Sequence, residues 1–412
     1  MTKPELLIPA GNMEKLEFAI KYGADAVYLG GKNFSLRAGA DNFSYEEMKE
    51  AVDFAHIYGK KAYITLNIIP HNKDLEHIFE YITYIANIGA DAVIISDPGV
   101  LEIVKSAAPN LKVHLSTQAN TVNWKSCNFW HNLGVKRIVL ARELSLEEIK
   151  EIRRKTPKSL ELEVFIHGAM CISYSGRCLI SNYMTYRESN RGMCAHPCRY
   201  KYYLMEEKRP GKFFPVFEDD RGTYFFNSKD LCMLDKIPEL AELNLTSYKV
   251  EGRMKSVHYV AQVTKSYRNV IDNFYENPDK FHFRSEWMAE LLKTSHREFT
   301  HGFYFDKPKQ NGQIYDHSTY IRDYDFVGII RHYDKKTKIA TVEQRNPVKI
   351  NDVVELLCPE KDNFSIKISK MWDDEGNEIF QAPHPNQIFK IELDEEVNPY
   401  TIIRRAKEDI MR

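Results

Sequence analysis

Five of the seven cysteines gather in one part of the sequence, between residues 169 and 245. They are Cys171, Cys178, Cys194, Cys198 and Cys232. The stretch around them is polar and rich in glycine, so we do not expect all five to be buried simply as small hydrophobic side chains. Grouped thiols suit three kinds of chemistry: a disulfide, a nucleophilic thiol, or a metal site.

The composition argues against disulfides. The chain starts with MTKPELLIPAGN, which lacks the charged and apolar regions of a secretory signal, and no apolar run approaches the roughly 20 residues that span a bilayer. We therefore expect a cytoplasmic protein without a membrane partner, in a compartment that keeps thiols reduced. The net charge of -1 predicts no general attraction to nucleic acid, so such a partner would need a local patch.

The cysteine spacing favours a metal site but does not identify the metal. The paired CxxC motifs typical of zinc are missing, and only Cys194 and Cys198 are close in sequence. An iron–sulfur cluster can take its four thiolates from separate loops. His167 lies near Cys171 in sequence, but a partner for a thiol nucleophile cannot be identified. Iron–sulfur and zinc both stay open, because thiolates bind both.

The elements that must position these cysteines alternate between strands and helices. Short runs rich in Val, Ile and Leu alternate with amphipathic segments, which predicts parallel strands joined by helices. The expected strands are 5–10, 25–30, 61–67, 91–97, 112–118, 136–142, 162–168 and 246–252. Eight such units over about 250 residues are typical of a (β/α)8 TIM-like barrel. An open dinucleotide-binding sheet is disfavoured, because no GxGxxG follows the first strand.

Two domains are predicted. Residues 1–320 would form the barrel, with a cysteine-rich insertion at about 169–245 that is far longer than an ordinary connection. Residues 325–412 alternate apolar and polar positions between turn residues, which predicts a small antiparallel β-barrel domain. Cys171 follows the seventh strand, and barrel enzymes carry their chemistry at the carboxyl ends of the strands.

Polar side chains at these strand ends are the candidate catalytic residues. They are Arg142, Glu143, His167, Glu251 and Arg253. Arg142 and Arg253 suit a small dicarboxylate substrate, because a guanidinium binds a carboxylate through two parallel hydrogen bonds. His167 could move a proton. Each of the five could equally cap a helix or form an internal hydrogen bond or ion pair.

Cations and aromatic residues interleave in the second part of the insertion. The cations are Arg187, Arg191, Arg199 and Lys201, and the aromatic residues are Tyr183, Tyr186, Tyr200 and Tyr202. This mixture suits a single-stranded RNA loop with a splayed base, although the same residues could simply cover a metal cluster.

Specific motifs carry a family resemblance. The signature residues are Glu163, Phe165, Gly168, Ala169, Cys171, Ser175, Gly176, Cys178 and Ser181. They resemble the collagenase-like peptidase family, peptidase family U32. The motifs PAGN, YLGGKNFSLRA, SDPGV, HLSTQAN, RGMCAHPCRYKY, NSKDLC and KVEGRMKS extend the resemblance over residues 1 to about 320. The tail is similar to the family's C-terminal β domain, and HGAMCISYSGRCLIS looks most like the branch that hydroxylates tRNA.

The resemblance implies a chemistry that composition and spacing do not. It implies hydroxylation of the wobble uridine of tRNA to 5-hydroxyuridine, with prephenate as the hydroxyl source and a partner protein of the same family. It also implies a [4Fe-4S] cluster, because Cys171, Cys178, Cys194 and Cys232 match the family's ligands in order and spacing. Cys198 would then be a spare thiol or a replacement for Cys194.

Two other functions remain as alternatives. One is a peptidase, although the chain has neither HExxH nor GxSxG. The other is a non-catalytic iron–sulfur interaction protein.

Overall fold

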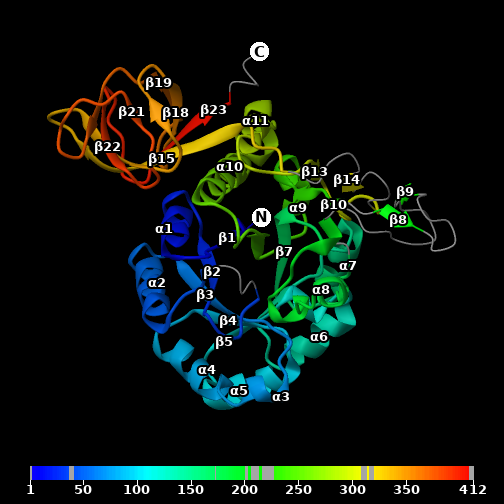
Figure 1. Cartoon of the computed structure of the whole chain (residues 1–412). Coiled ribbons are helices and arrows are strands. Elements are labelled where there is room, and N and C mark those ends of the chain that lie inside the picture. Colours follow the sequence, from blue (N-terminus) through cyan, green and yellow to red (C-terminus); the bar gives the residue numbers. More distant parts are fainter. Residues whose placement is uncertain are drawn as a thin grey trace.

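Eight parallel strands close into a barrel with helices around it (Figure 1). This computed structural model describes residues 2–36, 41–171, 173–199, 203–205, 213–215, 227–307, 313–314 and 320–407. The barrel strands are β1 (Glu5–Pro9), β2 (Ala26–Gly30), β3 (Lys61–Leu66), β4 (Ala92–Ile95), β5 (Lys112–Leu115), β6 (Arg137–Val139), β7 (Glu161–Ala169) and β12 (Ser247–Val250). The barrel closes because β12 pairs in parallel with both β1 and β7. The predicted TIM-like barrel and its strands are confirmed.

The helices around the barrel begin at residues that the local sequence marks. Ser44 and Glu47 form a capping box at the start of α2 (Tyr45–Ile57), and Ser145 and Glu148 form another at α7 (Leu146–Lys155). The other helices outside the insertion are α1 (Met13–Lys21), α3 (Asn72–Leu75), α4 (Ile78–Asn87), α5 (Pro98–Ala107), α6 (Trp124–Asn132), α10 (Val257–Glu276) and α11 (Ser285–Leu292), and α9 (Ile237–Ala241) lies in the last part of the insertion. No helix in the described ranges is both long and apolar enough to cross a membrane.

A buried ion network ties several barrel strands together from inside. Glu163 of β7 is fully buried and pairs with Arg137 of β6 at 3.1 Å and with Lys249 of β12 at 3.0 Å. Arg137 also pairs with Glu5 of β1 at 2.7 Å. Removing one partner would leave a buried charge without compensation, so the network fixes these strands relative to one another.

The insertion after β7 carries the irregular elements. It contains α8 (Ile180–Thr185), β8 (Tyr203–Met205), β9 (Phe213–Pro215), β10 (Asn227–Ser228) and β11 (Asp230–Cys232). The strand β11 joins the barrel sheet antiparallel to the end of β7, and β13 (Phe299–Thr300) extends the sheet beyond β11. The strand β14 (Gln313–Ile314) pairs with β10. A strand of two or three residues shows no periodicity, so the sequence did not predict this extension.

A curled antiparallel sheet forms the C-terminal domain, as predicted (Figure 1). Its strands are β15 (Tyr324–Asp334), β16 (Ile339–Gln344), β17 (Val348–Lys349), β18 (Val353–Leu357), β19 (Phe364–Lys367), β20 (Met371–Asp373), β21 (Gln381–Ala382), β22 (Ile388–Glu392) and β23 (Ile402–Ala406). Burial alternates along β16 and β22, which is the pattern of a sheet with one face on a core.

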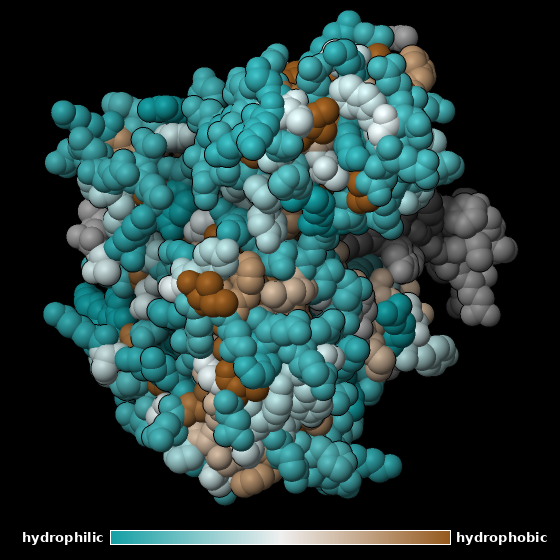
Figure 2. All heavy atoms as spheres, turned by 90° about the vertical axis from the view of Figure 1, so that its left-hand side faces the viewer, coloured by the Kyte–Doolittle hydropathy of each residue, from teal (hydrophilic) through white to brown (hydrophobic). Residues whose placement is uncertain are grey.

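The C-terminal domain packs against α1 and α10. Phe18 and Tyr22 of α1 share a buried apolar cluster with Ile329 and Ile402. The Tyr22 hydroxyl donates to the carbonyl oxygens of Leu357 at 2.7 Å and of Tyr400 at 2.9 Å. On the face that includes this side of the molecule, the surface is mostly hydrophilic and hydrophobic residues form only small separate groups (Figure 2). The apolar surfaces that join the domains are therefore turned toward each other.

Candidate active site

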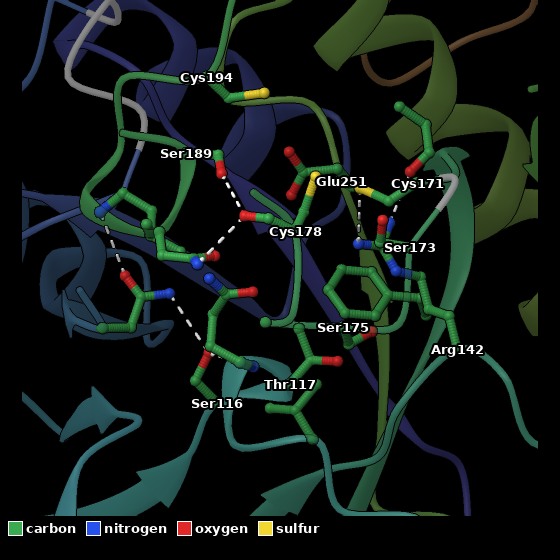
Figure 3. Close-up of a pocket in the computed structure, with 18 of the residues that line it drawn as sticks. Ser116, Thr117, Arg142, Cys171, Ser173, Ser175, Cys178, Ser189, Cys194 and Glu251 are labelled. Atoms are coloured by element: carbon green, nitrogen blue, oxygen red, sulfur yellow. Dashed lines mark hydrogen bonds between the residues drawn. The ribbon is translucent and has the colours of Figure 1, made fainter. Parts of the chain in front are cut away.

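A cavity opens at the carboxyl ends of the barrel strands (Figure 3). Its polar lining comes from the ends of several strands: Thr65 of β3 and Asn67 directly after it, Ser116, Thr117 and Gln118 after β5, Arg142 after β6, and Lys249, Glu251 and Arg253 from β12 and its continuation. The insertion covers it with the segment from Cys171 to Cys198. This is the end of a (β/α)8 barrel at which catalysis takes place.

Four thiols line this cavity. They belong to Cys171, Cys178, Cys194 and Cys198. The first three were predicted as cluster ligands. In the view of Figure 3, the sulfur atoms of Cys171 and Cys178 lie next to each other and that of Cys194 is set apart from them. Thiols of this number and type suit a [4Fe-4S] cluster or zinc. In the described part of the chain, however, no three Cys, His, Asp or Glu side chains are grouped closely enough to hold a metal ion.

The predicted fourth ligand, Cys232, lies elsewhere. It ends β11, opposite His167 of β7, and is 2% exposed. The Tyr267 hydroxyl lies 3.7 Å from its Sγ, and burial raises the pKa of Cys232 to about 12. Cys232 is not among the cavity-lining residues. The structure thus brings together three predicted ligands with Cys198, and not with Cys232.

Glu143 fixes the loop between Cys171 and Cys178. The Glu143 carboxylate accepts hydrogen bonds from the backbone N–H of Ser175 at 3.0 Å and from its hydroxyl at 3.2 Å. Gly176 follows in the left-handed region, with φ of 76°. A Cβ there would lie 2.1 Å from the Gln118 carbonyl oxygen, so only glycine fits this close approach. This contact gives Glu143 a structural role in the loop, and a catalytic role for Glu143 stays a prediction.

Hydrogen bonds also fix the loop around Cys178 and Cys194. The Ser189 hydroxyl donates to the Cys178 carbonyl oxygen at 2.7 Å. The backbone N–H of His196 lies 3.4 Å from the Cys194 sulfur, which suits a thiolate acceptor.

Arg142 reaches the cavity from the end of β6. Its Nη1 donates to the Ala169 carbonyl oxygen at 2.5 Å, its Nη2 lies 3.9 Å from the Cys171 sulfur, and its guanidinium stacks over the Phe165 ring at 4.8 Å. The guanidinium therefore brings positive charge beside a thiol and into the cavity.

Arg253 lines the same cavity but is 3% exposed. Its Nη1 donates to the Ser35 hydroxyl at 2.7 Å and to the Leu36 carbonyl oxygen at 2.8 Å, and its Nη2 donates to the Asn42 side chain. These bonds hold the segment after β2 against the barrel mouth. That Arg253 contacts a dicarboxylate stays a prediction.

Glu251 lies between this cavity and a second one. Its carboxylate accepts from the Tyr28 hydroxyl at 3.2 Å, and its carbonyl oxygen accepts from the Tyr259 hydroxyl at 3.0 Å. Glu251 lines both cavities, so it forms part of the wall that they share.

His167 faces α10 and β13 and is not among the cavity-lining residues. Its Nδ1 lies 3.3 Å from the Tyr267 hydroxyl, and its ring packs against those of Tyr267 and Phe299. Burial lowers the pKa of His167 to about 3, so the imidazole is neutral near neutral pH. Proton transfer by His167 stays a prediction, and the contacts seen are those of a packed, hydrogen-bonded side chain.

The basic and aromatic segment divides into different roles. Tyr186 is 93% exposed and Arg187 is exposed. Arg191 instead forms a two-pronged ion pair with Asp74. The side chains of Tyr183, Arg199, Tyr200, Lys201 and Tyr202 lie outside the described residues.

Comparison with known proteins identifies the family. The model of peptidase family U32 matches residues 11–314, and that of the peptidase family U32 C-terminal domain matches residues 322–404. This chain belongs to peptidase family U32.

Curated relatives match most of the chain. The tRNA hydroxylation protein P1 of Bacillus subtilis is 44% identical over 98% of this chain and 95% of its own length. The tRNA hydroxylation protein P of Escherichia coli is 35% identical over 93% of this chain and 92% of its own length. The 23S rRNA 5-hydroxycytidine C2501 synthase of Escherichia coli is 36% identical over 74% of this chain and 47% of its own length.

One cavity residue of this U32 protein was missed by sequence reasoning. Lys249 lies within β12, is 5% exposed, and holds its ammonium 4.4 Å from the centre of the Tyr28 ring. A lysine inside an otherwise apolar barrel strand is rarely buried without a partner, and that signal could have identified it.

Proposed function

We propose that this U32 protein hydroxylates the wobble uridine of tRNA, with prephenate as the hydroxyl source and a [4Fe-4S] cluster as cofactor. The observation that carries the proposal is the cavity at the carboxyl ends of the barrel strands, which four cysteines line together with Arg142 and Lys249. The names of relatives that match this chain over most of its length support tRNA hydroxylation.

The thiols are the proposed cofactor ligands. Cys171, Cys178 and Cys194 would hold three irons from the cavity wall. Cys232 is the proposed fourth ligand, and it would have to leave its contact with Tyr267 to join them. Cys198 already lines the cavity and is the competing fourth ligand. A bound cluster would supply redox or Lewis-acid chemistry beside the substrate.

The cations of the cavity suit the two carboxylates of prephenate. Arg142 brings a planar fork of donors into the cavity, and Lys249 adds a compact charge from the barrel interior. Both are partly occupied by protein acceptors, which keeps them in fixed orientations. We propose that they orient the donor, while Asn67, Ser116 and Gln118 offer hydrogen bonds to the edge of the uracil ring.

The test combines cofactor analysis with an activity assay. Anaerobically purified protein should contain iron and acid-labile sulfide and show a broad absorption band near roughly 400 nm. With prephenate and unmodified tRNA transcript, it should form 5-hydroxyuridine at the wobble position, detected by mass spectrometry of nucleosides. A transcript with cytidine at that position is the control. Zinc in place of iron would contradict the cofactor, and undiminished wobble hydroxylation in a deletion strain without a paralogue would contradict the function.

A further inference from the structure

A second cavity lies between the barrel mouth and the C-terminal domain. It has a volume of about 890 Å³. Its barrel side is formed by residues between Glu251 and His258, together with Ser295 and Arg297. Its C-terminal side is formed by residues between Tyr320 and Phe326, together with Asn346 and Lys407. Ala169, His196 and Glu251 line both this interdomain groove and the thiol-lined cavity, so the two spaces are adjacent.

The sizes of the two spaces differ in a way that matters for an RNA substrate. The thiol-lined cavity has a volume of about 130 Å³, about one seventh of that of the interdomain groove, so it can admit only a small part of an RNA chain such as a single base. A base turned into that cavity would leave its ribose, its phosphates and the neighbouring nucleotides outside. The adjoining groove is the larger space on the other side of the shared wall.

Cations outnumber carboxylates along the interdomain groove. The cations are Lys255, Arg297, Arg322 and Lys407, and the carboxylates are Glu251 and Asp325. Arg297 is neutralised by buried Asp230 at 2.5 Å. Lys407 is 42% exposed and lies 3.9 Å from Asp325, a weak surface pair. Arg322 is exposed, and no carboxylate of the described residues is within ion-pair distance of it.

The start of α10 adds groups that suit a sugar–phosphate chain. This 20-residue helix begins in the groove at its N-cap, Ser256, so its positive end faces the same space. His258 is 4% exposed, lines the groove, and its Nε2 has no hydrogen-bond partner among the described residues. An imidazole nitrogen without a protein partner can form a hydrogen bond with a ribose hydroxyl.

Aromatic rings complete the groove. Tyr320, Tyr324 and Phe326 line it, each partly exposed. Lys255 lies 3.9 Å from the centre of the Tyr320 ring. Partly exposed rings beside cations are the combination that stacks unpaired bases and holds their phosphates.

We infer that the interdomain groove binds the single-stranded loop of the RNA substrate, with phosphates at Arg322, Lys407 and the start of α10, so that one base can pass the shared wall into the thiol-lined cavity. This inference rests on the proposed function, since it assumes an RNA substrate. It assigns to the C-terminal domain the role of holding the nucleotides that flank the modified one.

The test measures RNA binding separately from hydroxylation. The probe is a short labelled RNA hairpin with an unpaired uridine-rich loop, titrated by fluorescence anisotropy at several salt concentrations. The double variant Arg322→Gln/Lys407→Gln should bind about tenfold more weakly, and its salt dependence should be less steep by about 1.4 in log–log slope, because two phosphate contacts are lost. Wild-type protein should prefer the hairpin to a fully paired RNA duplex.

The matched control is Lys349→Gln/Lys367→Gln. Both lysines are exposed on the C-terminal domain and line neither cavity. This variant should bind RNA like the wild type. If the groove variant also binds with wild-type affinity and salt slope, the inference is overturned while the proposed function stands. If only prephenate affinity falls, the groove holds the donor and the inference is equally overturned. If the wild type binds no RNA, the proposed function fails with it.

Discussion

The carboxylate of Glu143 holds Ser175 by both its backbone N–H and its hydroxyl, at 3.0 and 3.2 Å. Ser175 lies between Cys171 and Cys178 in the sequence, so this contact sets the path of the loop that carries both thiols. Glu143 therefore acts on the proposed cofactor site through the loop, as a positioning residue.

Substitution of Glu143 should affect cofactor retention. We expect Glu143→Ala to lose about 1–3 kcal/mol of loop stabilisation, because two donors of Ser175 lose a charged acceptor. Iron content after anaerobic purification should then fall. Glu143→Gln keeps one acceptor oxygen and should restore most of the iron. Equal iron in the wild type and the alanine variant would show that the contact does not position the thiols.

Arg142 should be required for hydroxylation more than for folding. We expect Arg142→Ala to lower the hydroxylation rate by about 10- to 100-fold, which corresponds to losing one charged hydrogen bond to substrate. Arg142→Lys should recover only part of the rate, because an ammonium lacks the planar fork. The measurement is 5-hydroxyuridine formed per enzyme, with KM for prephenate determined separately. Arg154→Ala, at an exposed position on α7, is the control and should leave both quantities unchanged.

The fourth cluster ligand can be identified by substitution. Alanine at Cys171, Cys178 or Cys194 should abolish the iron–sulfur absorption if, as proposed, each supplies a cluster ligand. Alanine at Cys232 should do the same, and alanine at Cys198 should not. If alanine at Cys198 abolishes the absorption and alanine at Cys232 does not, Cys198 is the fourth ligand, and all four ligands already line the cavity. Cys127, buried in α6, is the control, and Cys127→Ala should keep the cluster.

His258 should make folding stability depend on pH. Burial, with a further contribution from nearby Arg404 that Glu290 opposes, lowers the pKa of His258 from 6.5 to about 3. The folded state therefore favours the neutral ring. The contribution of this ring to the free energy of unfolding is fully present above about pH 6.5 and is lost as the pH falls toward 3.

The measurement is urea denaturation at about pH 7 and about pH 5. His258→Leu should reduce the loss of unfolding free energy between these values by about 1–2 kcal/mol. His384→Leu removes an exposed histidine of the C-terminal domain and should leave the loss as in the wild type. An unchanged pH dependence in His258→Leu would mean that the ring is not buried in its neutral form.

Arg404 should control the docking of the C-terminal domain. It is fully buried and donates to Glu290 of α11 at 2.6 Å, to Glu355 of β18 at 3.0 Å and to Gln262 of α10. We expect Arg404→Met to cost about 2–3 kcal/mol, because two partly buried carboxylates lose one of their cationic partners and keep only Lys293, and Gln262 loses a charged donor. Limited proteolysis should then cleave faster between the domains. Arg405→Met is the control, because Arg405 pairs with Asp352 and Asp325 of its own domain, and it should leave the rate of cleavage between the domains unchanged.

The barrel could be predicted from the sequence because its signals are local. Each strand is a short buried run, and capping residues such as Ser44 and Ser145 mark where helices begin. Because the ends of the strands could be predicted, Arg142 and Cys171 could also be placed just after the carboxyl ends of β6 and β7.

The contacts of the site could not be predicted, because distant segments decide them. Arg253 meets Ser35 and Asn42 from the other end of the barrel domain. Cys232 belongs to β11, whose pairing with β7 places it outside the cavity. A strand of three residues is too short to show a periodicity in the sequence. Alternation along β7 would place His167 on the same side as Glu163 and Phe165, which face the barrel interior and the cavity. The register between β7 and β12 shifts just before His167, so its ring instead faces Tyr267 of α10, and a shift of this kind leaves no signal in the sequence.

The cluster that joins Phe18 and Tyr22 to Ile402 also bears on how the chain folds during synthesis. Helix α1 is synthesised long before β23, yet Ile402 of β23 covers part of its apolar face. Contacts between such remote segments form late and slowly. Until Ile402 has been made, this part of the apolar face of α1 stays exposed, and chaperones can bind to it.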